Sequence, residues 1–299
     1  MKDRWITIVN PAAGGGRCGE RSVKAIAELR AAGLELDVYR TTKAGDATAI
    51  AREQSAKGEK SFLAIGGDGT SWEIVNGLFP RVTNGAPPRL AQLPLGTGNS
   101  FLRDFGIKDA AAAMRAIVQG RERPCDVLRV KHQGGEIHAI NIVGVGFTAE
   151  VGALTNRRYK PYGAAGYVMG VLQTAIDLKS PVYPLRLDGG SVDSRPALLL
   201  SFCNSRCTAG TMQMAPNAEV SDGELDVIRI APRGRLSFFS QFPSIFAGTH
   251  VQRAGVEETR ARRVELDLDR AIDTMIDGEV LSLALRSIEV VPSALRIVA

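Results

Sequence analysis

Cysteine and histidine are scarce in this sequence of 299 residues, which contains four cysteines and three histidines. No two cysteines form a C-x-x-C pair, and the histidines are scattered along the chain. Four cysteines are too few for disulfide bonds to hold together a chain of this length, and their spacing gives little support to a structural zinc site. We therefore expect reduced thiols in a cytosolic protein.

Aromatic residues and excess charge are also limited. Lys and Arg number 37 against 32 Asp and Glu, which leaves a formal net charge of +5, and aromatic residues make up 6%. Nucleic-acid binding would need a larger basic excess and more platforms for base stacking. We expect no nucleic-acid partner, whereas a phosphate ligand or an anionic membrane surface is compatible with this charge.

Long apolar runs of the membrane-spanning or secretory kind are missing. The first residues lead straight into a strand-like run at 5–9, without a secretory apolar region. The most apolar long stretch, Tyr162–Leu178, is interrupted by three glycines and a glutamine. Its apolar positions at helical spacing favour a core face, and the alternatives are an acyl-chain pocket or a contact with a bilayer.

The remaining composition, 44% hydrophobic and 23% charged, is typical of a globular protein of one large or two ordinary domains. Up to about residue 118, strands (5–9, 34–39, 61–65, 90–93) alternate with helices (20–32, 47–56, 72–78, 109–118), which indicates a parallel sheet. Strands then dominate (126–131, 136–143, 183–187, 197–204, 224–230, 263–267, 274–285), with helices only at 163–178 and 236–247. We predict an α/β domain at 1–123 and a β-rich domain at 124–299, whose last segment could return to the first.

Three glycine clusters, at 14–19, 66–70 and 96–99, each follow a predicted strand of the first domain. In an open α/β sheet the carboxyl ends of the parallel strands share one edge, where ligands bind. Glycine at such a turn lets backbone N–H groups approach phosphate oxygens, helped by the N-terminus of the next helix. One such turn would indicate only a tight connection, but three on one edge favour a nucleotide or phosphate site.

The first cluster also matches a dinucleotide-binding fingerprint. Its glycines at 14, 16 and 19 have the G-x-G-x-x-G spacing, and Asp37 follows at about 20 residues. An NAD(P)-dependent oxidoreductase is therefore an alternative. Against it, Asn10-Pro11 lengthens a turn that is tight in the Rossmann fold, and the other two clusters stay unexplained. A Walker A loop is excluded, because Glu20-Arg21 stands where Lys-Ser/Thr would be needed.

Several blocks together carry a family resemblance. The most specific is Gly66-Gly67-Asp68-Gly69-Thr70 followed by Glu73-Ile74-Val75-Asn76-Gly77. The others are Asn10-Pro11-Ala12-Ala13-Gly14, Leu93-Pro94-Leu95-Gly96-Thr97-Gly98-Asn99, Ala215-Pro216-x-Ala218, Asp222-Gly223-x-Leu225-Asp226-Val227 and Asp277-Gly278-Glu279. In this order, over nearly the whole chain, they resemble the diacylglycerol kinase catalytic-domain family, which includes sphingosine and ceramide kinases and bacterial lipid kinases.

The resemblance implies a two-domain lipid kinase, with an α/β nucleotide domain like that of NAD kinases, a β-sandwich-like domain and a nucleotide cleft between them. It also implies that ATP lies along the glycine loops. The residues it places at ATP are Asn10, Pro11, Ala12, Ala13, Gly14, Thr41, Gly66, Gly67, Asp68, Gly69, Thr70, Glu73, Gly96, Thr97 and Asn99.

Phosphoryl transfer needs a carboxylate that holds Mg²⁺ near the phosphates and a group that takes the acceptor's proton. Asp68, inside its glycine turn, suits the metal. By resemblance Glu279 is the proton acceptor and Asp277 assists, and both reach one site only if Gly278 bends the chain. The resemblance also implies a second, structural metal site. Its candidates are Glu219, Asp222 and Glu224, for which a solvated acidic turn is an equal interpretation.

Two positions depart from the pattern common in bacterial lipid kinases, because Ser100 and Ser221 stand where an acid is frequent. These departures put the substrate in doubt and keep open a catalytically silent nucleotide-sensing protein. The main hypothesis is an ATP- and Mg²⁺-dependent kinase that phosphorylates a diacylglycerol-like lipid at a peripheral membrane surface, with a homodimer left open. The basic residues at 157–160 and at 260, 262 and 263 are candidates for meeting anionic headgroups, or form a solvated face.

Overall fold

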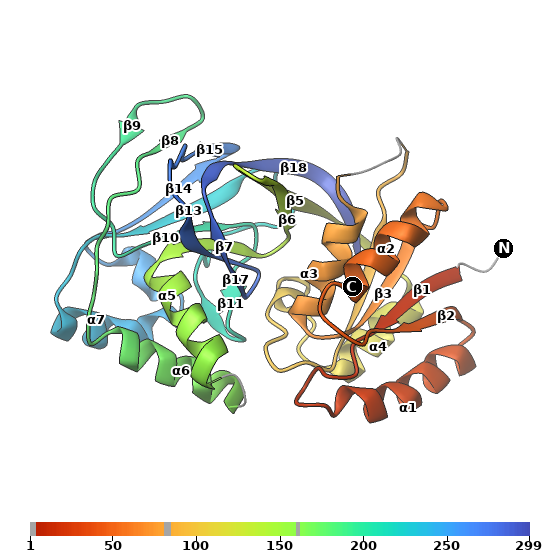
Figure 1. The fold of residues 1–299 in the computed structure, drawn as a ribbon. Helices are drawn as coiled ribbons and strands as arrows, with labels where there is room; N and C mark the ends of the chain where they lie inside the picture. The colour runs from red at the N-terminus through yellow and green to blue at the C-terminus, as the bar shows by residue number, and fades with distance from the viewer. Residues whose placement is uncertain (1–3, 81–84, 160–161) are drawn as a thin grey trace. The chain divides into compact units, whose positions relative to one another are not determined.

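The computed structural model describes residues 4–80, 85–159 and 162–299 (Figure 1). The chain divides into two compact units. Unit 1 contains Met1–Cys125 together with Ser293–Ala299, and unit 2 contains Asp126–Pro292. Each unit is described by itself below.

Unit 1 is an α/β domain with a parallel sheet, as the alternating pattern predicts. Its elements are β1 (Arg4–Val9), α1 (Cys18–Ala31), β2 (Glu35–Arg40), α2 (Asp46–Ala56), β3 (Ser61–Gly66), α3 (Asp68–Leu78), β4 (Arg89–Pro94), the short 3₁₀ helix η1 (Phe101–Phe105) and α4 (Ala110–Gln119). The strands run in the order β2-β1-β3-β4, with the end of β18 (Leu285–Val298) added parallel to β4.

The sequence pattern explains why these elements form. All six residues of β3 are buried, as expected for a parallel strand covered on both faces. The helix α4 begins where Asp109 accepts a hydrogen bond from the Ala112 N–H (2.7 Å), and it ends at Gly120 in the left-handed conformation. The buried side chains of Leu29, Leu63 and Ile117 pack in one core between sheet and helices.

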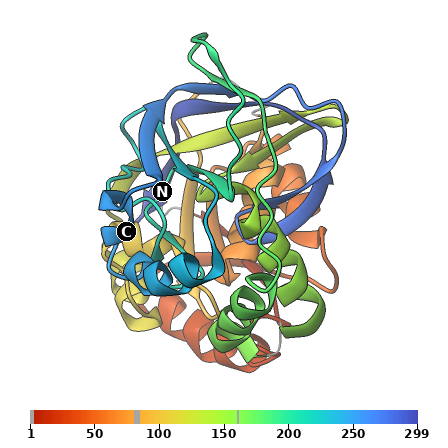
Figure 2. The same cartoon turned by 90° about the vertical axis from the view of Figure 1, so that its left-hand side faces the viewer.

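Unit 2 is β-rich and contains a six-stranded antiparallel sheet in the order β14-β13-β10-β7-β16-β17. These strands are β7 (Ile142–Gly146), β10 (Leu199–Cys203), β13 (Leu225–Ile230), β14 (Val256–Ala261), β16 (Ile272–Ile276) and β17 (Glu279–Leu283). The other strands are β5 (Glu122–His132), β6 (Gly135–Ala139), β8 (Leu185–Leu187), β9 (Val192–Asp193), β11 (Cys207–Thr208), β12 (Met212–Gln213) and β15 (Arg263–Glu265). The hairpin of β8 and β9 projects from the unit (Figure 2).

Helices of unit 2 pack on the six-stranded sheet. They are α5 (Phe147–Leu154), the π-helical turn η2 (Thr155–Tyr159), α6 (Gly163–Thr174), α7 (Arg235–Gln241) and the 3₁₀ helices η4 (Phe242–Ile245) and η5 (Thr249–Gln252). Side chains such as Val151, Val171 and Phe238 form one core cluster with Leu199 and Ile228 of the sheet. None of the helices that the structure describes is long and apolar enough to cross a membrane.

The structure corrects several predicted elements. The strand predicted at 136–143 is two strands, β6 and β7, and the one predicted at 274–285 is a hairpin of β16 and β17 followed by β18. The helix predicted at 236–247 is α7 followed by a 3₁₀ turn, and the one predicted at 163–178 ends at Thr174. Sequence patterns missed α5, β14 and β18.

Candidate active site

The three glycine loops meet at the carboxyl edge of the unit 1 sheet. The N–H groups of Leu95 and Gly96 donate to the Gly66 carbonyl (2.7 and 2.8 Å), and the Asn10 N–H donates to the Ile65 carbonyl (3.0 Å). The loops after β1, β3 and β4 are therefore tied together by backbone hydrogen bonds. This confirms the expectation that they converge on one edge.

Two of the contacts between these loops require glycine. A Cβ atom on Gly96 would lie 2.4 Å from Gly67 Cα, and one on Gly14 would lie 2.5 Å from the Leu95 carbonyl oxygen. Gly14 also has a φ of 61°, which favours glycine. Backbone rather than side chains therefore lines this edge, which suits the binding of phosphate oxygens by N–H groups.

Asp68 is the first residue of α3 and is held from two directions. Its Oδ2 accepts the Ser100 N–H (2.7 Å), and its Oδ1 accepts Gln92 Nε2–H (3.3 Å). Burial raises the pKa of Asp68 above its ordinary value, and the hydrogen bonds from Ser100 and Gln92 act in the opposite direction. The carboxylate is therefore fixed in place at the helix N-terminus, beside the glycine loops.

Asn99 presents a buried oxygen at the same place. Its Nδ2 donates to the Gly96 carbonyl (2.8 Å), and its backbone is left-handed with a φ of 48°. Its Oδ1 has no hydrogen-bond partner within the described part of the chain. That oxygen lies 3.3 and 3.7 Å from the positions that Cβ atoms on Gly96 and Gly67 would take. A buried acceptor without a partner at a loop junction indicates a ligand.

The other residues of the first loop shape its backbone. Asn10 Oδ1 accepts the Ala12 N–H (3.1 Å), and Asn10 Nδ2 donates to Thr70 Oγ1 (3.4 Å). The Ala13 N–H donates to the Asn10 carbonyl (3.1 Å). Pro11 packs against Gly19, since a Cβ atom there would lie 3.3 Å from Pro11 Cβ. This loop and the Gly66–Thr70 loop are therefore linked through the Asn10 side chain.

Three further predicted contacts have different surroundings. Thr41 follows β2 and donates its N–H to the Val9 carbonyl (2.9 Å), so it lies at the same sheet edge. Thr97 is exposed in the third loop. The Glu73 Oε2 accepts the Ala47 N–H (3.1 Å) at the start of α2, so this carboxylate also stabilises a helix N-terminus.

In unit 2, Asp277 and Gly278 form the two-residue turn of the β16–β17 hairpin, with φ values of 49° and 95°. The Asp277 carboxylate is buried and accepts three backbone N–H groups, from Ile140, Asn141 and Ile142, at 2.9 to 3.0 Å. Glu279 begins β17 and is half-buried. The turn does bend the chain at Gly278, but Asp277 is directed into the backbone between β6 and β7.

Two of the three carboxylates predicted for a second metal are paired with arginines. Asp222 lies 3.7 Å from Arg260, and Glu224 lies 3.6 Å from Arg262. Glu219 is exposed. Among the described residues no group of three or more His, Cys, Asp or Glu side chains is arranged to hold a metal ion. The second metal site stays a prediction.

Both units of the chain match known protein families. The diacylglycerol kinase catalytic domain matches residues 4–130, and the YegS C-terminal NAD kinase beta sandwich-like domain matches residues 141–299. The chain is 30% identical over 293 residues to the diacylglycerol kinase of Mycobacterium tuberculosis (strain ATCC 25618 / H37Rv), covering 97% of this chain and 93% of that one.

The chain belongs to the diacylglycerol kinase catalytic-domain family. It is therefore a kinase whose acceptor is an alcohol group. The diacylglycerol kinase of Bacillus subtilis (strain 168) is 28% identical over 276 residues, which are 91% of this chain and 88% of that one.

Solved structures of relatives agree with the fold. One from Bacillus anthracis str. Sterne has a TM-score of 0.80 at 26% identity and covers 99% of this chain and 97% of that chain. A diacylglycerol kinase structure from the same organism has a TM-score of 0.73 at 23% identity, with coverage of 99% and 96%. The two-domain fold of an α/β domain and a β-sandwich-like domain is therefore the one predicted.

Sequence reasoning missed two side chains at the candidate site of unit 1. Gln92 holds Asp68 from the neighbouring strand, and the Arg103 cation lies near enough to favour the charged form of Asp68. A polar residue among the apolar residues 90–93 of β4 is a signal that identifies Gln92. Arg103 had no such signal, because it reaches the site only through the fold of η1.

Proposed function

We propose that this chain is an ATP- and Mg²⁺-dependent lipid kinase that transfers the γ-phosphoryl group to the hydroxyl of a diacylglycerol-like lipid. One observation carries the proposal. The Asp68 carboxylate is fixed at the N-terminus of α3, where three glycine loops present backbone N–H groups and where the Asn99 oxygen has no partner in the described chain. This combination suits a nucleotide phosphate with its cation.

The residues at this edge fit the two groups. Backbone N–H groups of these glycine loops would hold phosphate oxygens, apart from those that already donate within the chain, among them Asn10, Ala12 and Gly96. The oxygens of Asp68 and Asn99 are ligands that Mg²⁺ accepts, directly or through water. Bound Mg²⁺ neutralises the charge that develops on the transferred phosphoryl group.

The chain's own residues keep this geometry fixed. The Ser100 N–H and the Gln92 amide orient the two oxygens of Asp68, so Ser100 contributes through its backbone where relatives often have an acid. Preorganised groups of this kind cost no rearrangement during the reaction. A serine at position 100 is therefore compatible with activity.

For the acceptor, Glu279 is proposed as the group that takes the hydroxyl proton. Asp277 is proposed as a positioning residue, because its oxygens are already occupied by three backbone N–H groups. It would fix the β16–β17 hairpin and thereby the position of Glu279. This assignment separates two carboxylates that the motif alone treats as a pair.

An apolar cavity of unit 2 supports a lipid substrate. This unit 2 pocket is partly open to solvent and is lined by α5, α6, α7 and the six-stranded sheet through side chains such as Phe147, Val171, Leu199 and Phe238. An apolar lining with few polar groups suits an apolar ligand such as an acyl chain. We propose it as the acyl-chain site.

A peripheral membrane encounter is proposed for the same face of unit 2. Two of the helices that line the pocket, α6 and α7, expose apolar side chains, among them Met169 and Leu172 of α6 and Leu236 of α7. Figure 1 shows the two helices in unit 2. Exposed apolar groups beside a lipid pocket suit transient contact of a cytoplasmic enzyme with a bilayer. The basic residues at 260, 262 and 263 contribute less than expected, because all three pair with carboxylates. Of the basic run at 157–160, Lys160 lies outside the described residues.

The decisive experiment is transfer of labelled phosphate from ATP to a panel of micellar lipids, with and without Mg²⁺. We expect Mg²⁺-dependent labelling of a diacylglycerol. Asp68→Asn should lower the rate about 100-fold or more, because it removes the charge that holds the cation. Asp37→Asn is the matched control, since Asp37 lies in β2 and pairs with Arg4.

The outcomes separate the alternatives. Wild-type turnover in a folded Asp68→Asn protein would remove Asp68 from the mechanism. Binding of ATP without transfer to any lipid would favour a catalytically silent nucleotide-sensing protein. Binding of NAD(P) in place of ATP would favour the oxidoreductase. The pairing of Asp37 with Arg4 and Tyr39 leaves this carboxylate engaged, which counts against a ribose-binding role.

A further inference from the structure

Two buried polar side chains line the mainly apolar unit 2 pocket. Each has one atom that lacks a hydrogen-bond partner in the described part of the chain. They are Thr148 and His250, which are 2% and 4% exposed. The Thr148 Oγ1 and the His250 Nδ1 have no hydrogen-bond partner within the described ranges. Buried polar atoms in folded proteins nearly always have partners, so each of these needs an explanation.

The hydrogen-bonding character of His250 follows from its other nitrogen. His250 Nε2 lies 3.0 Å from the Met214 carbonyl oxygen, which can only accept, so Nε2 carries the proton. Burial also lowers the pKa of His250, which favours the neutral ring. Its Nδ1 therefore offers a lone pair and requires a donor from whatever occupies the pocket.

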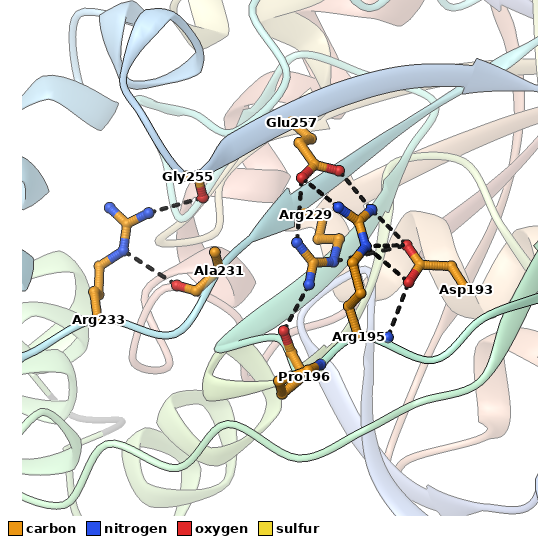
Figure 3. A network of polar contacts seen from close by, with 8 residues as sticks. All are labelled: Asp193, Arg195, Pro196, Arg229, Ala231, Arg233, Gly255 and Glu257. Carbon is orange, nitrogen blue, oxygen red and sulfur yellow. Dashed lines mark hydrogen bonds and ion pairs between the residues drawn. The ribbon is translucent and has the colours of Figure 1, made fainter.

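Two further polar side chains of the pocket, Arg233 and Gln241, are already engaged. Arg233 donates to the carbonyls of Ala231 and Gly255 (Figure 3). It also donates to Gln241 Oε1, and Gln241 in turn donates to Ser237 Oγ. The Tyr167 hydroxyl belongs to the lining as well. Thr148 and His250 are set apart by a buried atom that has no partner among the described residues.

We propose that the unit 2 pocket binds an acyl chain that carries a hydroxyl group along its length, with this hydroxyl bonded to His250 Nδ1 and to Thr148 Oγ1. An unsubstituted acyl chain or an ester offers no donor to Nδ1. A hydroxyl is the smallest substituent that both donates and accepts, so it serves both atoms without adding bulk to an apolar cavity. The inference rests on the proposed function in taking this pocket as the acyl site.

Thr148, in the first turn of α5, lies at the side of the pocket that faces the sheet. Thr148 lies against Gly144 of β7, since a Cβ atom there would be 3.1 Å from Thr148 Cγ2. Gly144 lies in the middle of its strand, paired with Ser201 and Met275. The hydroxyl is therefore expected within the chain, over the sheet, and not at the headgroup.

The test is direct binding to the full chain and needs no turnover. The probes are stearic acid and hydroxystearic acids with the hydroxyl at carbon 3, 10 or 12, measured by displacement of a fluorescent fatty acid. We expect at least one hydroxystearic acid to bind about tenfold more tightly than stearic acid, the gain expected when a buried polar group finds its partner. Thr148→Val should cut that preference to less than about threefold without weakening the binding of stearic acid, because it removes one hydroxyl and keeps the shape.

Ser201→Ala is the matched control. Ser201 Oγ is also buried without a partner among the described residues, but Ser201 does not line the pocket, so the preference should persist. His250→Phe is the second variant and should also remove the preference. Equal affinity for all four acids, or an unchanged preference in both pocket variants, would overturn the proposal, because bridging water would then satisfy both atoms. A preference for a hydroxystearic acid, with no phosphate transfer to any lipid in the labelled-phosphate assay, would instead leave this inference standing and refute the proposed phosphorylation of a diacylglycerol-like lipid.

Discussion

At the scale of single residues, the two carboxylates of the β16–β17 hairpin have different surroundings. Asp277 is 7% exposed and accepts three backbone N–H groups, whereas Glu279 is half-buried at the start of its strand. A carboxylate that accepts several N–H groups stabilises the local backbone and has little capacity left for a substrate proton. The sequence motif Asp-Gly-Glu does not distinguish the two roles, because it carries no information on long-range hydrogen bonds.

This difference predicts opposite effects of substitution. Asp277→Ala should lower the free energy of unfolding by about 3 kcal/mol, because three buried N–H groups lose their acceptor. Glu279→Gln should leave that free energy near the wild-type value and lower phosphate transfer about 100-fold or more. Urea unfolding and the transfer assay on both variants check this. A stable Asp277→Ala protein that has lost only activity would show Asp277 to be catalytic.

A second residue-scale prediction concerns pH. Burial lowers the pKa of His138 to about 4, and the Arg129 cation acts in the same direction. The carboxylate of Glu136, 3.8 Å from Nε2, acts in the opposite direction, and burial outweighs it. In the unfolded chain histidine titrates near 6.5. The unfolded state therefore binds the proton first, so stability is full above about pH 6.5 and is lost as the pH falls toward 4.

The expected loss is about 3 kcal/mol between pH 7 and pH 4, relative to His138→Gln, which does not titrate. The measurement is urea unfolding of both proteins at the two pH values. His132→Gln, at a half-buried position on the same β5–β6 hairpin, is the control and should keep the wild-type pH dependence. Parallel pH curves for wild type and His138→Gln would contradict the burial argument.

At the scale of elements, local patterns predicted the strands and helices of unit 1 to within a few residues, because β1, β3 and β4 end at or just before a glycine, asparagine or proline. They failed where tertiary contacts decide. The residues at 140–141 interrupt an apolar run only because Asp277 takes their N–H groups. The helix α5 follows β7 directly, with no residue between them, so no cap or turn signal marked its start. The strand β14 carries three charged residues, and among them Arg260 pairs with Asp226.

The charged network that joins β9, β13 and β14 is a further feature of elements (Figure 3). Arg229 of β13 is nearly buried and donates to the Pro196 carbonyl (2.7 Å) and to Glu257 of β14 (3.4 Å). Arg195 is exposed and binds both Glu257 and Asp193. Both arginines thus pair with Asp193 and Glu257, but Arg229 is nearly buried and Arg195 is exposed to solvent.

We expect Arg229→Met to lower the free energy of unfolding by about 2 kcal/mol, because it leaves the Pro196 carbonyl without its donor and removes the cation that pairs with the partly exposed Glu257. Arg195→Met should have a clearly smaller effect, since water and salt screen an exposed pair. Thermal unfolding of both variants at low and at high salt is the measurement. Equal losses of unfolding free energy in the two variants would mean that the burial of the arginine does not decide how much its ion pairs stabilise the fold.

At the scale of the whole molecule, β18 links the two units. Its residues at 285–292 belong to unit 2, and those at 293–299 add a parallel strand beside β4 in unit 1. The family motifs predicted both domains, because each motif is local and lies at a strand end. They could not predict how β18 is shared, since its partners β15 and β4 lie more than 20 and about 200 residues away.

Removing residues 293–299 should therefore unfold unit 1, although this segment is the most distant from it in sequence. Leu295, Ile297 and Val298 are 2% exposed or less, and burial of each contributes about 1.5–3 kcal/mol, so their loss is comparable with the stability of a domain. Hydrogen exchange should show lost protection in β3 and β4. Arg296→Lys, which keeps the strand, should leave the exchange unchanged. Full protection in the truncated chain would show that β4 is stable as an edge.

The shared strand also has a consequence for the order of events during synthesis. Translation delivers β1 to β4 early, but the strand that completes their sheet is made only after all of unit 2 has been translated. Until then β4 presents an open edge with unpaired backbone groups, of the kind that pairs with other chains. The nascent protein therefore has its period of greatest risk of aggregation in its N-terminal unit, and a chaperone that covers this edge would be most useful before residue 299 leaves the ribosome.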